Sequence, residues 1–192
     1  MSYLAYLFSF LCSQDASRSF LVAGHALPMC QRCTGLYMGM ALGFIYVLLR
    51  PQHRRNFPPR WIVCVNILCL LVMPVFGFHL LDPGPAWRLW TGLIYGSAII
   101  LLLVPAAWIL CTGGKERAGD SGPASVSFVL FFVLLNSIPL WLPLRSTWFL
   151  YCVVVLATVG AICTAACIAA VVFCAICQVI WKGVRHVDAP EA

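Results

Sequence analysis

Charged side chains are scarce in this chain: they make up 9% of its 192 residues, whereas hydrophobic residues make up 62%. That balance lies far outside the range of a soluble domain, so lipid is the expected solvent. The six acidic residues all lie in loops or tails, and no long apolar run contains one. Proton-coupled transporters usually carry a carboxylate within a span, so the sequence argues against that class.

Motifs of several enzyme classes are missing as well. The chain has no G-x-S-x-G elbow, no P-loop and no H-E-x-x-H pair, and its four histidines all lie near helix ends or in loops. The basic residues are spread over short loops between apolar runs, which argues against a nucleic-acid-binding face. The sequence therefore assigns no catalytic residue.

What the chain does contain is five apolar runs long enough to cross a bilayer. They cover about Thr34–Leu49, Trp61–Leu80, Leu89–Cys111, Ser125–Leu142 and Trp148–Ile176. None shows the strict alternation of a barrel strand, so the predicted fold is all-α, a polytopic transmembrane helix bundle. The opening run, Tyr3–Cys12, is too short to span and is expected at the interface or folded back on the bundle.

The basic residues also predict an orientation. Eight of the twelve fall on one side of a five-helix arrangement, and four fall on the other. The larger group is Arg50, Arg54, Arg55, Arg60, Lys115, Arg117, Lys182 and Arg185. Cytoplasmic loops carry the excess of Lys and Arg, so we expect the N-terminus outside and the C-terminus inside. We expect an outer cap (1–29), a helix bundle (30–181) and a cytoplasmic tail (182–192), set in a prokaryotic cytoplasmic membrane.

A cysteine cluster lies at the start of the first run. Cys30 and Cys33 form a CxxC pair, and Cys12 and His25 precede it. Three thiols and an imidazole are the donor set of a tetrahedral zinc site, and thiols also suit copper. The alternatives are a structural disulfide and a reactive thiol pair, which a helix N-terminus and Arg32 would both activate.

Two further features accompany this cluster. Arg18, Arg32, Arg88 and Asp82 share the predicted outer face and could line an anion site, or simply fix the loops. The pattern T-G-L-x-x-G occurs twice, and each copy follows an arginine. Its glycines, with one more in the first run, predict close helix packing: Gly35, Gly39, Gly43, Gly92 and Gly96.

The combination of Cys12, Cys30-x-Arg32-Cys33-Thr34-Gly35-x-Tyr37-x-Gly39, Arg88 and Thr91-Gly92-x-x-x-Gly96 resembles the prokaryotic membrane proteins of domain of unknown function 2085. The resemblance covers roughly residues 10–100. It implies a small multi-spanning membrane protein and supplies no activity.

Three functional hypotheses follow from the sequence. The first is a non-enzymatic membrane protein that binds zinc or copper through Cys12, Cys30 and Cys33, with His25 as the fourth ligand. The second is a thiol–disulfide oxidoreductase using Cys30 and Cys33, and the third is an accessory subunit of a larger membrane complex. The expected partners are the lipid bilayer and either a second copy of the chain or other membrane subunits. Five more cysteines in the last run are interpreted as packing residues.

Overall fold

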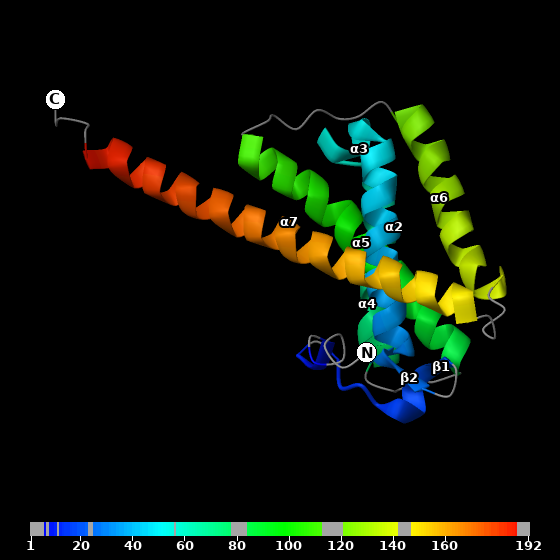
Figure 1. Ribbon diagram of the computed structural model, residues 1–192. Helices are drawn as coiled ribbons and strands as arrows, with labels where there is room; N and C mark the ends of the chain where they lie inside the picture. The colour runs from blue at the N-terminus through cyan, green and yellow to red at the C-terminus, as the bar shows by residue number, and fades with distance from the viewer. Residues whose placement is uncertain are drawn as a thin grey trace.

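Helices dominate the structure, which is a computed structural model describing residues 6, 8–10, 12–22, 25–55, 57–77, 84–112, 121–141 and 147–187. In chain order the elements are η1 (Ala16–Arg18), β1 (Ser19–Val22), β2 (His25–Cys30), α2 (Gln31–Leu49), α3 (Pro51–Arg55), α4 (Arg60–Gly77), α5 (Pro85–Thr112), α6 (Ser121–Trp141) and α7 (Thr147–Val187). The all-α membrane bundle predicted from the sequence is confirmed, and Figure 1 shows its arrangement.

The N-terminal region contains a small hairpin that the sequence did not predict. β1 and β2 pair antiparallel, with Leu21 opposite Ala26, and the register is irregular between Ser19 and Leu21. Phe20 and Leu27 are buried and join the core cluster, so the hairpin covers one end of the bundle with apolar side chains. A sequence of only a few residues per strand carries too little periodicity to reveal such a hairpin.

Glycines set the contact between α2 and α5. A Cβ atom at Gly35 would overlap the carbonyl oxygen of Leu89, and one at Gly39 would overlap that of Leu93. From the other helix, a Cβ atom at Gly96 would overlap the carbonyl oxygen of Leu36. Residue numbers rise together along the contact, so the two helices run parallel and their backbones touch.

The other helices alternate in direction around this pair. The end of α4 meets the start of α2, where Arg32 donates a hydrogen bond to the carbonyl of Phe76. α6 also runs antiparallel to α5, because Trp90, near the start of α5, donates a hydrogen bond to Asn136, near the end of α6. The hairpin end of the bundle therefore holds the starts of α2 and α5 and the ends of α4 and α6. The opposite end, the α3 end, holds the ends of α2 and α5 and the starts of α4 and α6.

α7 lies obliquely across α2 and continues beyond it toward the C-terminus (Figure 1). Its contact uses Gly160, where a Cβ atom would overlap the carbonyl oxygen of Tyr37, and Thr164, which contacts the Met40 sulfur at 3.3 Å. Further along, Gln178 donates to the carbonyl of Leu110 in α5. α7 thus starts at the hairpin end, as α2 and α5 do.

Three helical segments are long and apolar enough to cross a membrane: Gln31–Leu49, Pro85–Thr112 and Tyr151–Gln178. Two more apolar helices have shorter described stretches, Arg60–Phe76 and Ser125–Ser137. All five correspond to runs predicted from the sequence. The boundaries differ most at α7, which extends to Val187, and next at α5 and α6, which begin at Pro85 and Ser121.

Candidate metal centre

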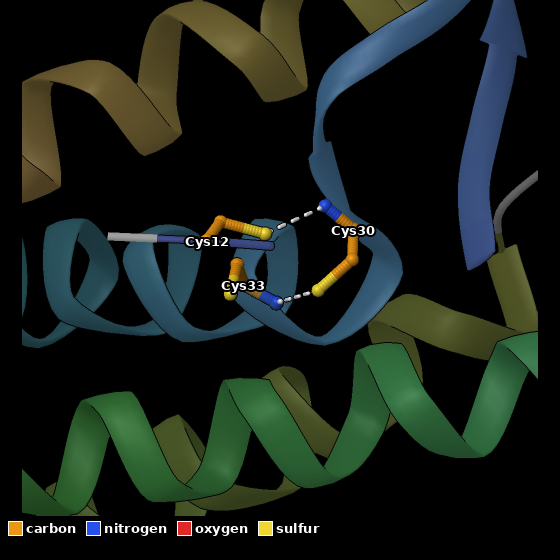
Figure 2. A group of neighbouring side chains, drawn as sticks. All are labelled: Cys12, Cys30 and Cys33. Atoms are coloured by element: carbon orange, nitrogen blue, oxygen red, sulfur yellow. Dashed lines mark hydrogen bonds between the residues drawn. The ribbon is translucent and has the colours of Figure 1, made fainter. Parts of the chain in front are cut away.

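Three cysteines converge at the hairpin end of the bundle. The Sγ atoms of Cys12, Cys30 and Cys33 all lie within 4.8 Å of one another (Figure 2). Three sulfurs around a tetrahedral ion at about 2.3 Å would be about 3.8 Å apart, so a shift of about 1 Å would close the site. All eleven cysteines of the chain are free thiols.

The junction between β2 and α2 positions the CxxC pair. Cys30 ends the strand and is the N-cap of α2, and its Sγ accepts a hydrogen bond from the backbone N–H of Cys33 at 3.5 Å. Capping by a side chain at this position satisfies an N–H group that the helix itself leaves without a partner. The cap therefore holds both sulfurs on the same side of the first turn.

Cys12 reaches this turn from a different part of the chain. Its N–H donates to the carbonyl of Phe8 at 2.9 Å, and its Sγ accepts from the backbone N–H of Cys30 at 3.3 Å. The residue is 8% exposed, so its sulfur is buried and does not lie on the surface. These contacts bring a thiol from 18 residues upstream to the CxxC pair.

Electrostatics at the cluster favour a thiolate on Cys12. Hydrogen bonds from the Cys30 side chain, and then from the Cys33 side chain, hold the pKa of Cys12 well below its ordinary value. The backbone N–H groups of Cys30 and Gln14 act in the same direction, whereas burial opposes them. A thiolate is the form that binds a metal ion or attacks a disulfide.

Apolar side chains form the inner wall of the cluster. Cys33 packs in one cluster with Phe8, Met29 and Tyr37, and Met29 is completely buried. Ala157 of α7 belongs to the same cluster, so the long helix joins the apolar packing next to the site. Such a wall limits water access and strengthens electrostatic attraction between thiolates and a cation.

The arginines predicted near this site each have a protein partner. Arg32 donates to the carbonyl of Phe76, and Arg88 donates to the side-chain oxygen of Gln31 at 3.1 Å. Arg18 lies 3.5 Å from the carboxylate of Asp15, a pair in which both side chains are well exposed. The Arg32 and Arg88 contacts join α2 to α4 and α5, and an anion-lining role for these arginines stays a prediction.

Two predicted site residues are not placed by the structure. The backbone of His25 pairs with Val22 in the hairpin, but its side chain lies outside the described residues. Asp82 also lies outside them, as does His79.

Sequence reasoning missed two residues beside the site. Gln31, which lies inside the CxxC pair, is buried at 6% exposure and accepts the hydrogen bond from Arg88. Gly160 lets α7 approach α2, and its signal is a lone glycine in a long apolar helix.

Comparison with known proteins places the sequence of this chain in a family. Residues 12–102 match the family model described as predicted membrane protein, domain of unknown function 2085. An uncharacterized protein of Methanothermobacter thermautotrophicus is 33% identical over 101 residues, which cover 50% of this chain and 86% of that protein. The chain belongs to this family. The match begins at Cys12 and ends within α5, so it includes all three clustered cysteines and the glycine contact.

A second relative, an uncharacterized protein of Methanocaldococcus jannaschii, is 30% identical over 104 residues. The aligned segment covers 52% of this chain and 65% of that protein, so the chain spans just under two thirds of its length. No solved structure gives a significant match. Both relatives are archaeal, and neither name states an activity. The family match therefore confirms a membrane protein but does not indicate its chemistry.

Proposed function

We propose that this protein is a metal-binding membrane protein whose Cys12, Cys30 and Cys33 thiolates hold one zinc or copper ion. The observation that carries the proposal is the convergence of three sulfurs within 4.8 Å of one another from two separate parts of the chain. Thiolates suit zinc and the softer copper(I) ion, and an all-sulfur set disfavours magnesium and calcium. His25 is the proposed fourth ligand.

Support also comes from how the thiols are held. The backbone N–H groups of Cys30 and Cys33 each donate to a cluster sulfur, which stabilises negative charge before an ion arrives. The donors lie at the N-terminus of α2, where the helix dipole adds to the effect. A bound cation would offset the mutual repulsion of three thiolates.

The site is proposed to face outward from a prokaryotic cytoplasmic membrane. Arg50 and Arg60 flank α3, at the opposite end from the three clustered cysteines, and in the sequence Lys115 and Arg117 stand between α5, which ends there, and α6, which begins there. The sidedness of basic residues thus follows the alternation of the five helices, with the α3 end cytoplasmic. The outer cap, the bundle and the tail then keep the ranges 1–29, 30–181 and 182–192.

Metal content tests the proposal directly. Protein purified in mild detergent without chelators is analysed by inductively coupled plasma mass spectrometry beside a Cys30→Ser, Cys33→Ser double variant. We expect close to one zinc or copper ion per parent chain and almost none in the double variant. The matched control is Cys64→Ser, Cys152→Ser, which removes two exposed thiols in α4 and α7 and should keep the metal.

The two competing functions give different outcomes. Absence of metal, together with a Cys30–Cys33 disulfide found by mass spectrometry after thiol blocking, would overturn the metal site and support the oxidoreductase. Absence of metal with fixed co-purifying membrane proteins would support the accessory subunit. Equal metal in the parent and the double variant would show that the ion binds elsewhere.

A further inference from the structure

A second polar cluster lies at the α3 end, far along α2 from the cysteines. The hydroxyl of Tyr46 is 3.2 Å from Nε2 of His53 and 3.1 Å from Oγ of Ser127. All three side chains are buried, at 7% exposure each. They come from α2, α3 and α6, so one phenol links three elements through its hydrogen bonds.

His53 anchors the short helix α3 to the bundle. Its neighbours Pro51 and Gln52 are exposed, whereas its imidazole packs against the Tyr46 ring with centroids 5.2 Å apart. The Tyr46 ring also stacks on Phe131 of α6, with ring centroids 4.5 Å apart. A helix of five residues has little stability of its own, so its position depends on this buried side chain.

The surroundings of His53 favour its neutral form. Burial lowers the pKa of His53, and the positive charge of Arg50 lowers it further. The facing groups are Tyr46 of α2 and Arg50, which lies between α2 and α3, and the uncharged Ser127 of α6 reaches the same Tyr46 hydroxyl. The last turns of α5, which also contact α3, carry no titratable side chain from Leu101 to Leu110.

A neutral imidazole completes the hydrogen-bond chain. With the proton on Nδ1, Nε2 accepts from the Tyr46 hydroxyl, and the same oxygen accepts from Ser127. A proton added at Nε2 would place a charge in a buried site beside Arg50, with no carboxylate among the groups named above to offset it.

We infer that His53 is a proton-binding site at the α3 end of the bundle, and that protonation of its imidazole releases α3 from Tyr46 of α2. The sign follows from linkage. When docking of α3 lowers the pKa of His53, the histidine stabilises the docked helix fully above its ordinary pKa. Docking then weakens as the pH falls below that value. This inference does not depend on metal at the cysteine cluster.

Hydrogen–deuterium exchange across residues 50–59 tests the inference. Free histidine titrates near pH 6.5, so the opening equilibrium of α3 should rise by up to about tenfold between about pH 7.5 and about pH 5.5. The exchange of the parent is divided at each pH by that of His53→Gln, which keeps a hydrogen-bonding side chain but does not titrate. This ratio removes the intrinsic effect of pH on exchange.

Selective labelling of histidine provides the second measurement. In labelled parent protein, the NMR signal that disappears in His53→Gln should titrate below pH 6.5, together with the change in exchange. His186→Gln, which removes a histidine near the end of α7, should leave both results unchanged. A ratio that stays flat with pH, or a His53 signal that titrates at or above 6.5, would overturn the inference. Should His53→Gln fail to fold, the titration of the parent, assigned against His25, His79 and His186 variants, decides the question alone.

Discussion

At the scale of the residue, each thiol of the cluster has a distinct structural position. Cys30 caps α2, Cys33 lies in the first turn, and Cys12 is buried beneath the cap. The CxxC spacing predicts the proximity of the first two, because a helical turn brings them to one side. The place of Cys12 depends on its contacts with Phe8 and Cys30, which no spacing encodes.

Replacing Cys12 with serine should weaken metal binding more than it weakens the fold. The change removes one of three sulfur ligands, so we expect the affinity to fall by at least about a hundredfold, the upper end of the effect of losing an outer-shell partner. Competition with a chromophoric chelator measures the loss. Cys69→Ser, at a buried cysteine of α4 outside the cluster, should bind as the parent does. Equal affinity in the Cys12 variant would remove that residue from the ligand set.

At the scale of the element, backbone contact between α2 and α5 fixes the start of α2 and so the cysteine cluster. The contact tolerates no side chain at Gly35, Gly39, Gly92 or Gly96, because the nearest atoms are backbone atoms of the partner helix. Gly43 differs, since its nearest neighbour would be the side chain of Ile100 at 3.1 Å. The repeated T-G-L-x-x-G pattern predicts two small-residue faces, and only the structure pairs them.

Substitution along this contact should show graded losses of stability. Gly96→Ala forces two backbones apart and should cost about 1–3 kcal/mol, although alanine is the better helix former by about 1 kcal/mol. Gly43→Ala displaces only a side chain and should cost less. The midpoint of thermal unfolding in detergent, followed by circular dichroism, ranks the two variants against the parent. The opposite ranking would mean that backbone atoms do not set how closely α2 and α5 approach.

At the scale of the whole molecule, the long helices α2, α4, α5, α6 and α7 alternate in direction, and α7 crosses α2 before extending past it (Figure 1). The alternation separates the chain into a hairpin end with the cysteines and an α3 end with His53. Arg18, Arg32 and Arg88 lie at the hairpin end, and Arg50 and Arg60 lie at the α3 end.

Reporter fusions test the resulting topology. Alkaline phosphatase, which is active only outside the cytoplasm, should be active when joined after Gly84 and inactive when joined after Thr112. A green fluorescent protein at the C-terminus should fluoresce, because the tail is cytoplasmic in this topology. Inactivity after Gly84 would mean that α4, one of the two shorter apolar helices, does not span, and the number of crossings would fall.

The sequence by itself determined the class of solvent, the five apolar helices and the donor chemistry of Cys30 and Cys33, because composition, run length and local spacing act over one element. It also carried the family match, which rests on residues 12–102. These are local properties, so they can be predicted without knowing which helices touch.

Only the tertiary structure decided which distant groups meet. Cys12 contacts Cys30, which is 18 residues further along the chain, and Arg88 donates a hydrogen bond to Gln31, which is 57 residues before it. Tyr46 and Ser127 are 81 residues apart in the chain and yet share a hydrogen bond. Such contacts depend on how close two backbones can approach, which the glycines permit and the packing of every other side chain sets.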